Sequence, residues 1–266
     1  MIKVGIFGSS GRMGHQLIRS VSRQSDMSVS GGICHEPFED ITIQLEDQKT
    51  LSVKIFKDAK SLAEASDVVI DFTIASVLDQ HIEACYDVKT PMVIGTTGFG
   101  DTTKNNLHEA SKIIPILQAG NMSLGVNLLS ALVKQAASAL GEDWDIEITE
   151  AHHRMKVDAP SGTALLLGEA AAEGRERTLS DVQKLSREGH TGQRPTGEIG
   201  FSTIRAGAII GDHSVMFAHD NEIITLSHRA QDRKIFADGA VYAARKLISL
   251  SPKLYDMIDI LDIRAS

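Results

Sequence analysis

The sequence predicts an α/β protein in two parts, a doubly wound parallel sheet and a second α+β domain with a mixed or antiparallel sheet. Two observations favour this class. In the first half, short apolar β-like runs alternate with helical patterns, and each run ends in polar or glycine residues. In the second half, several β-like runs follow one another without intervening helices, which is typical of antiparallel or mixed pairing.

The first half supplies the strands and helices of the doubly wound sheet. Residues 2–7 form an apolar, β-like run, and apolar residues then recur at helical spacing between residues 13 and 21. Three further apolar runs are predicted to be strands, at residues 68–70, 92–94 and 113–117. Sheets of this kind bind ligands beyond the carboxyl ends of their strands.

The second half begins with a long predicted helix over residues 124–140. Between residues 144 and 148, apolar and polar side chains alternate, as they do in a half-buried strand. Later elements are predicted as strands at about 200–206, 208–218 and 222–228 and a helix at about 234–250. Residues 184–200 are rich in glycine, arginine, threonine and proline, and we expect them to form a mobile, lid-like loop.

Bulk composition excludes several classes of function. The chain has 266 residues, of which 42% are hydrophobic and 23% charged, as in a soluble globular protein. Its net charge of −8 argues against nucleic-acid or anionic-membrane partners, because those partners need a basic surface. Cys34 and Cys85 are too few for a disulfide framework. No signal peptide or bilayer-spanning apolar run of roughly 18 residues is visible, so we expect a cytoplasmic protein.

A glycine turn, Gly8-x-x-Gly11-x-x-Gly14, lies between the first predicted strand and the first predicted helix. Glycine lets the backbone approach a pyrophosphate and lets the helix pack close to the strand. The turn departs from the dinucleotide fingerprint, because Ser10 takes the place of its second glycine. The pattern therefore favours a Rossmann-like dinucleotide site, and a purely structural turn is the alternative.

The end of the second strand is where an acidic residue usually binds the ribose of NAD. Here Cys34 takes that place and is followed by His35 and Glu36. Glu36 is the one acid that can substitute, while Arg12 and His35 offer positive charge to the 2′-phosphate of NADP. The alternative for Cys34 is a buried residue at a strand end.

The segment from Glu150 to Thr163, EAHHRMKVDAPSGT, has the composition of a catalytic loop. Its histidines, arginine and lysine can hold an anionic substrate and deliver a proton near neutral pH. Pro160 interrupts the preceding element, and an alanine-rich helical run follows. Backbone N–H groups of Ser161, Gly162 and Thr163 should therefore lie at a helix N-terminus, where they form a carboxylate or phosphate site.

This segment and the glycine turn closely resemble the dihydrodipicolinate reductase family, whose members act in the diaminopimelate route to lysine. The likeness runs nearly end to end. It includes four further strings, which are Gly95-Thr96-Thr97-Gly98-Phe99, Asn121 to Asn127, Ser186 to Gly192 and Phe236 to Ala240. The likeness covers the positions of both the glycine turn and the histidine-rich segment, so it predicts an NAD(P)H-dependent oxidoreductase.

The resemblance implies the positions that bind the cofactor, NADPH or NADH. They are Gly8, Ser9, Ser10, Gly11, Arg12 and Met13 at the first turn, Cys34 and His35 at the ribose end, and Gly95, Thr96, Thr97, Ala119, Gly120, Asn121 and Met122 around the nicotinamide. The last two groups also lie where strand ends place them, with simple loop turns as the alternative. The family often has an acid followed by an arginine at positions 34 and 35, and this chain departs from it at both.

The resemblance also implies the chemistry and the organisation of the chain. The substrate is a cyclic, unsaturated dicarboxylate that loses water from its 4-hydroxy form and receives a hydride and a proton. His152 matches the proton donor, Lys156 the second catalytic cation, and His153, Ser161, Gly162 and Thr163 the substrate-binding positions. The implied domains are residues 1–123 for the dinucleotide, 124–232 for substrate and oligomerisation, and 233–266 returning to the first domain. The implied assembly is a homotetramer built through the second sheet.

Other functions fit the sequence less well or leave part of it unexplained. A zinc site at His152 and His153 is disfavoured, because neighbouring strand residues point to opposite faces and no second ligand cluster follows. A solvated basic loop without catalytic role is the simplest alternative. A semialdehyde dehydrogenase would need a cysteine near the histidines, and an NAD(H)-sensing regulator without turnover would need a DNA-binding or partner module.

Overall fold

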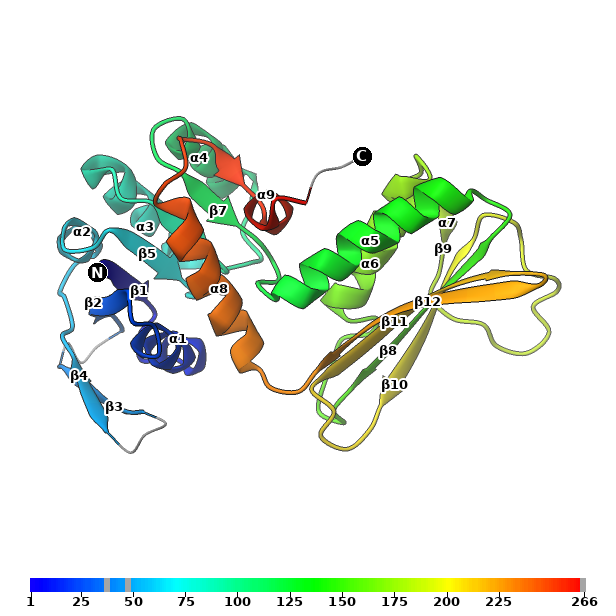
Figure 1. Cartoon of the computed structure of the whole chain (residues 1–266), viewed down its shortest axis with the longest axis horizontal. Helices are drawn as coiled ribbons and strands as arrows, with labels where there is room; N and C mark the ends of the chain where they lie inside the picture. The colour runs from blue at the N-terminus through cyan, green and yellow to red at the C-terminus, as the bar shows by residue number, and fades with distance from the viewer. Residues whose placement is uncertain (36–38, 46–48, 264–266) are drawn as a thin grey trace. The chain divides into compact units, whose positions relative to one another are not determined.

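The computed structural model describes residues 1–35, 39–45 and 49–263, which divide into two compact units (Figure 1). The first unit combines Met1–Ser123 with Lys234–Asp262, and the second is built on Leu124–Arg233. The predicted fold class is confirmed: one unit holds a parallel sheet with helices, and the other a mixed sheet. Among the described helices, none is both long and apolar enough to cross a membrane.

The first unit contains a six-stranded parallel sheet in the order β13-β7-β6-β5-β1-β2. The chain moves to one side of β1 for β2 and to the other side for β5, so the topological switch point lies at β1, where such sheets bind ligands. Their bounds are Ile2–Phe7 (β1), Met27–Ile33 (β2), Val68–Asp71 (β5), Met92–Ile94 (β6), Ile116–Gln118 (β7) and Leu254–Tyr255 (β13).

Helices cover this sheet because its central strands are apolar on both faces, as in β5, whose four residues are all buried. Helix α8 returns from the far end of the sequence and packs on α1, where Asp238 accepts a hydrogen bond from Ser20 at 2.6 Å. The helices are Arg12–Ser22 (α1), Ala59–Glu64 (α2), Ala75–Val88 (α3), Asp101–Ser111 (α4), Lys234–Leu247 (α8) and Met257–Leu261 (α9), and a hairpin pairs Ile41–Gln44 (β3) with Thr50–Val53 (β4).

The second unit contains a five-stranded sheet in the order β12-β11-β8-β10-β9. Strand β8 runs parallel to β10 and antiparallel to β11, so the sheet is mixed. Helices α5 and α6 pack on one of its faces. The bounds are Asp145–His152 (β8), Gln183–Lys184 (β9), Ile199–Arg205 (β10), Gly211–His219 (β11), Glu222–Ala230 (β12), Leu124–Leu140 (α5), Gly162–Gly174 (α6) and Leu179–Val182 (α7).

The register of the second sheet places every other residue of its strands in rows on the helix-covered face. Two rows are apolar, with the neighbours Ile199, Ile146, Phe217 and Ile224 in one and Phe201, Ile148, Val215 and Leu226 in the next. Their members on β10, β8 and β11 are buried in the core, whereas on β12 Leu226 is partly buried and Ile224 is 38% exposed. The two rows nearest the carboxyl end of β8 are Thr203, Glu150, His213 and His228, then Arg205, His152, Gly211 and Ala230. Along β8, the helix-covered face of the sheet thus changes from apolar core residues to charged and titratable residues.

Several predicted boundaries differ from the structure. The strand predicted at 113–117 starts only at Ile116, because the preceding residues finish α4 in a turn. The strand predicted at 208–218 starts at Gly211, since the chain turns at Gly207, which has a φ of +49°. The helix predicted to reach about 250 ends at Leu247.

Candidate active site

The turn after β1 has the shape of a phosphate cradle. Gly8 has a φ of +80°, and a Cβ on Gly14 would lie 2.3 Å from the Gly8 carbonyl oxygen, so both positions require glycine. Gly11 is the N-cap of α1 and brings no side-chain cap, so no N-cap side chain satisfies the first N–H groups of this helix. A helix start of this kind attracts an anion, and these residues fit the pyrophosphate of a dinucleotide.

The residues of this turn have different surroundings. Ser9 is fully buried, and its hydroxyl donates to the Ile33 carbonyl at 3.1 Å beneath the turn. Gly32 makes this possible, because a Cβ there would lie 2.3 Å from the Ser9 hydroxyl oxygen. The other predicted residues lie nearer the surface: Ser10, Gly11 and Arg12 are exposed and Met13 is half-buried. Ser9 therefore shapes the turn from below.

The loops after β6 and β7 lie at the same carboxyl edge of the sheet. Gly95 follows β6, and a Cβ there would lie 2.4 Å from the Phe72 ring. Thr96 is buried, whereas Thr97 is exposed. After β7, Gly120 is exposed, Ala119 and Asn121 are half-buried, and Met122 is buried. Parallel pairing of β1, β5, β6 and β7 brings these loops to the edge that carries the glycine turn.

Asp71, the last residue of β5, organises this edge and was not found by sequence reasoning. It is fully buried and accepts hydrogen bonds from the hydroxyls of Thr96 and Thr73, both at 2.7 Å. Its second oxygen lies 2.7 Å from Nδ1 of His81, whose ring stacks on Phe7. The polar residue that ends an otherwise apolar strand was the available signal.

At the ribose end, Cys34 follows β2 and is 8% exposed, so the expectation of a buried strand-end residue holds. His35 is exposed, and so is Arg12 on α1. Glu36, the acid considered as a substitute, lies outside the described residues.

In the second unit, His152 is the last residue of β8, and Glu150 lies two residues earlier on the same face. The Nδ1 atom of His152 lies 2.6 Å from Oε2 of Glu150. Arg205, at the end of β10, donates to both carboxylate oxygens of Glu150 at 2.8 and 2.7 Å. Burial opposes ionisation of Glu150, but hydrogen bonds from Arg205, His152 and the Ser161 N–H outweigh it, so its pKa lies below its ordinary value.

The loop after β8 presents further charged groups. Lys156 Nζ lies 2.9 Å from an Asp158 oxygen, and the Asp158 carbonyl accepts from Arg205 at 2.7 Å. His153 Nε2 accepts a hydrogen bond from Arg233 at 3.0 Å. Because a guanidinium only donates, His153 is neutral in this contact.

The predicted helix N-terminus after this loop is confirmed. Ser161 is the N-cap of α6, and its hydroxyl accepts from the Ala164 N–H at 3.2 Å. The same hydroxyl lies 3.1 Å from Nε2 of His213, so it is committed inside the protein, and Ser161 is 2% exposed. Gly162 is exposed and Thr163 half-buried on the first turn. Burial, with the nearby charge of His152, lowers the pKa of His213 to about 4.

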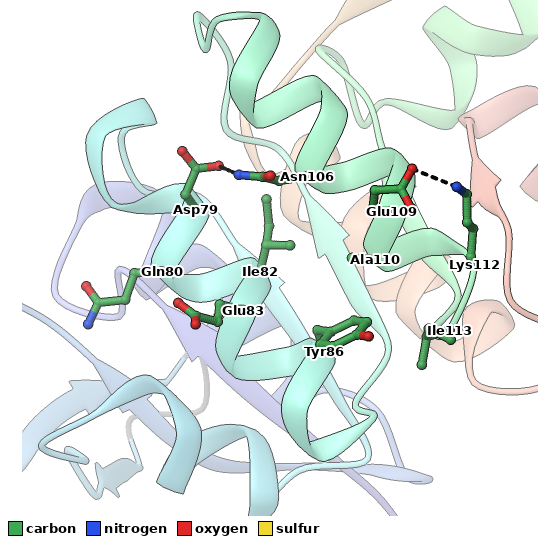
Figure 2. Close-up of a pocket in the computed structure, with 10 residues that line it drawn as sticks. All are labelled: Asp79, Gln80, Ile82, Glu83, Tyr86, Asn106, Glu109, Ala110, Lys112 and Ile113. Atoms are coloured by element: carbon green, nitrogen blue, oxygen red, sulfur yellow. Dashed lines mark hydrogen bonds and ion pairs between the residues drawn. The ribbon is translucent and has the colours of Figure 1, made fainter.

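A surface pocket of about 570 Å³ lies elsewhere in the first unit, between α3 and α4 (Figure 2). Its lining residues include Asp79, Tyr86, Asn106 and Ile113. The first three lie on α3 and α4, past the first turn of each helix, and Ile113 follows α4, whereas the glycine turns lie where helices begin, beyond the carboxyl ends of the strands. This pocket includes none of the predicted site residues. Among the described residues, no group of three or more histidine, cysteine or acidic side chains is placed to hold a metal ion.

Comparison with known proteins decides the family. The family model described as "Dihydrodipicolinate reductase, N-terminus" matches residues 2–122, and the one described as "Dihydrodipicolinate reductase, C-terminus" matches residues 125–261. The chain belongs to the dihydrodipicolinate reductase family. The resemblance drawn from the sequence is thereby confirmed, as is the expected enzyme class, an NAD(P)H-dependent oxidoreductase.

Individual relatives of this reductase family agree along the whole chain. The 4-hydroxy-tetrahydrodipicolinate reductase of Zymomonas mobilis is 48% identical over 98% of both chains, and that of Halorhodospira halophila is 46% identical over 98% of both. Among solved structures, the dipicolinate-bound dihydrodipicolinate reductase from Paenisporosarcina sp. TG-14 has a TM-score of 0.79 at 24% identity, covering 99% of this chain and 100% of its own. That structure supports the fold.

Proposed function

We propose that this protein reduces 4-hydroxy-tetrahydrodipicolinate, by way of dihydrodipicolinate, to tetrahydrodipicolinate in the diaminopimelate route to lysine. Family membership and relatives of that name at 46–48% identity support the substrate. The structural observation that carries the proposal is the change along one face of the second sheet. There the apolar core rows give way to Glu150, His152 and Arg205, next to the N-terminus of α6.

The substrate is a dianion, and the second unit supplies what two carboxylates need. The first turn of α6 offers the N–H groups of Gly162 and Thr163 and the positive end of the helix dipole. The hydroxyl of Thr163 and the imidazole of His153 add donors whose strength increases toward a charged acceptor. The buried hydroxyl of Ser161 stabilises this turn by accepting the hydrogen bond from the Ala164 N–H.

His152 donates the proton that the neighbouring ring carbon takes up. Its Nδ1 is occupied by Glu150, so Nε2 is the atom that reaches the substrate. Lys156 is the second cation. In this structure it pairs with Asp158, and it stabilises the negative charge that builds on the ring as reduction proceeds.

The glycine turn at residues 8–14 and the loops 95–97 and 119–122 would hold the dinucleotide at the carboxyl edge of the first sheet. When bound, it supplies the hydride. Residues 1–123 thus form the dinucleotide domain, 124–232 the substrate and oligomerisation domain, and 233–266 the segment that returns to the first. We expect both cofactors to be used, because the predicted acid is missing at Cys34 and Arg12 and His35 are exposed.

The protein acts in the cytoplasm as a homotetramer built through the second sheet. The face of that sheet away from α5 and α6 carries exposed apolar side chains, with Ile204 48% and Ile223 63% exposed. A second copy that covers this face would remove those side chains from water. Sedimentation analysis of the wild type and of Ile223→Lys tests the assembly.

Oxidation of NADH and NADPH, followed separately, tests the function, with the substrate generated in place from pyruvate and aspartate semialdehyde. We expect substrate-dependent oxidation of both cofactors and tetrahydrodipicolinate as the product. Binding of either cofactor without substrate-dependent oxidation would contradict the proposal and favour the NAD(H)-sensing alternative.

A further inference from the structure

Glu150 is a buried carboxylate in contact with His152, and the role inferred for it below rests on the proposed function. Glu150 is 1% exposed, although it lies at the open end of β8. A buried carboxylate is costly unless its oxygens are fully hydrogen-bonded. Glu150 meets that condition with donors from four residues: His152 on its own strand, Thr203 and Arg205 on β10, and Ser161 at the start of α6.

The partners of Glu150 fix the direction of each hydrogen bond. Arg205 binds both oxygens through its two terminal nitrogens, and the Ser161 N–H donates to Oε1 at 3.1 Å. The guanidinium keeps the carboxylate ionised, and an ionised carboxylate only accepts hydrogen bonds. The contact at 2.6 Å is therefore Nδ1–H of His152 donating to Glu150. The neutral imidazole carries its proton on Nδ1, which leaves Nε2 as the site that gains and loses the catalytic proton.

The space beside Nε2 is kept open by the neighbouring strand. Gly211 is the first residue of β11 and lies beside His152: a Cβ on Gly211 would lie 3.1 Å from Nε2. No side chain of that residue can therefore crowd the reactive nitrogen. Gly211 thus leaves Nε2 of His152 open, and Glu150 occupies Nδ1.

We propose that Glu150 is a positioning residue, which holds His152 in the Nδ1–H form and, balanced by Arg205, sets how readily Nε2 holds its proton. The negative charge of Glu150 favours the protonated form of His152, and the positive charge of Arg205 disfavours it. Glu150 does so without contacting the substrate.

Other charged and titratable groups face this pair. From β11 comes His213, whose buried ring packs edge-on against His152 with ring centres 5.1 Å apart. His228 of β12 follows in the same row, and the loop after β8 adds Lys156 paired with Asp158. Burial lowers the pKa of both His213 and His228, so these two rings are neutral at pH 7 and add no charge. Of the groups named, Glu150 therefore carries the fixed charge that contacts His152 directly, and Arg205 carries the fixed charge that contacts Glu150.

Glu150 and Arg205 carry opposite charges, so removing one or the other should move the alkaline limb of the kcat–pH profile in opposite directions. A purely structural role of the pair would not produce opposite shifts. Removing the carboxylate in Glu150→Gln disfavours the imidazolium, so the alkaline limb of the kcat–pH profile moves to lower pH by roughly one unit. Removing the guanidinium in Arg205→Gln moves the same limb to higher pH. We expect kcat to fall about 10- to 100-fold in Glu150→Gln, the scale seen when a group that orients a ligating histidine is lost. The KM for NADPH should not change.

Glu147→Gln is the matched control, because Glu147 lies on the same strand and also accepts two hydrogen bonds from one arginine, Arg187. Its side chain is on the opposite face from Glu150. We expect this variant to keep the wild-type kcat and alkaline limb. If Glu150→Gln and Arg205→Gln move the limb in the same direction, or if neither moves it, the proposal is overturned.

The wild-type protein provides a second test that needs no variant and no turnover. With histidine labelled with ¹⁵N, the spectrum of neutral His152 should show the proton on Nδ1. A proton on Nε2 would overturn the proposal, even if Glu150→Gln fails to fold. If the wild type shows Nδ1–H but oxidises neither cofactor with substrate, the proposed function has failed and the assignment of Glu150 as the orienting carboxylate has not.

Discussion

The carboxyl ends of the two sheets carry different kinds of binding groups. In the first unit, Gly8 and Gly95 directly follow β1 and β6, and a Cβ at either position would lie too close to neighbouring atoms. In the second unit, β8 and β10 end in His152 and Arg205, which are charged or titratable. Backbone N–H groups suit a phosphate, whose charge is constant, whereas proton delivery needs a side chain that titrates near neutral pH.

The helices that follow these ends differ in the same way. Helix α1 starts at Gly11 with no side-chain cap, whereas α6 starts at Ser161, whose hydroxyl caps its own helix. An anion at α1 therefore meets the first N–H groups without competition from a capping side chain. At α6 the cap satisfies the Ala164 N–H, so under the proposed function we expect recognition of the substrate to depend more on Thr163 and the histidines.

The largest effect is expected from removing the proposed proton donor, His152, or the second catalytic cation, Lys156, of the second unit. His152→Gln and Lys156→Ala should each lower kcat by roughly 10²-fold or more, with little change in the KM for NADPH, because they act on the chemical step and not on the cofactor. His219→Gln is the control, a histidine at the opposite end of the sheet that contacts Trp144. Near-wild-type kcat in both active-site variants would show that these two residues do not take part in catalysis.

A somewhat smaller effect concerns the stability of the second unit in acid. Because the pKa of His213 falls from 6.5 to about 4 on folding, its neutral form stabilises the native state above pH 6.5, and this stability is lost as the pH falls toward 4. The loss amounts to roughly 3 kcal/mol over the whole range and to about 2 kcal/mol between pH 7 and pH 5. Urea unfolding followed by fluorescence of Trp144, the sole tryptophan, measures it at pH 7 and pH 5. His213→Gln should show a weaker pH dependence, and an unchanged dependence would contradict this assignment.

The smallest effect is expected at the ribose end of the first unit. Cys34→Glu adds a ribose acceptor and repels a 2′-phosphate, so the ratio of kcat/KM for NADPH over NADH should fall, by a free energy of about 1 kcal/mol. Cys34→Ser adds no charge and should leave the ratio near that of the wild type. Strong NADH selectivity in the native chain that survives Glu36→Gln would show that this account of the strand end is wrong.

The sequence predicted those features that depend on neighbours along the chain. The cap at Ser161 was visible because Pro160 interrupts the chain immediately before it and an apolar helical run begins immediately after it. Glu150 was available from the same reasoning, since the alternation at Ile146 and Ile148 continues to Glu150 and His152 on one face.

Partners that come from distant strands were not predictable in this way. Arg205 is 55 residues from Glu150, and only the parallel register of β10 on β8 brings them together. His213 faces Glu150 through the antiparallel register of β11. Register depends on the packing of the whole sheet, because a slip of one residue turns every side chain to the other face.

The division of labour between the two units is tested most directly by measuring both KM values in Gly14→Ala and Thr163→Val. A methyl on Gly14 would lie 2.3 Å from the Gly8 carbonyl oxygen, so Gly14→Ala should raise the KM for NADPH and leave the KM for the substrate. Thr163→Val should do the reverse. Gly100→Ala is the control, since nothing lies within 4 Å of its Cβ position. If Thr163→Val instead raises the KM for NADPH and leaves that for the substrate, the α6 turn binds the cofactor and the account is contradicted.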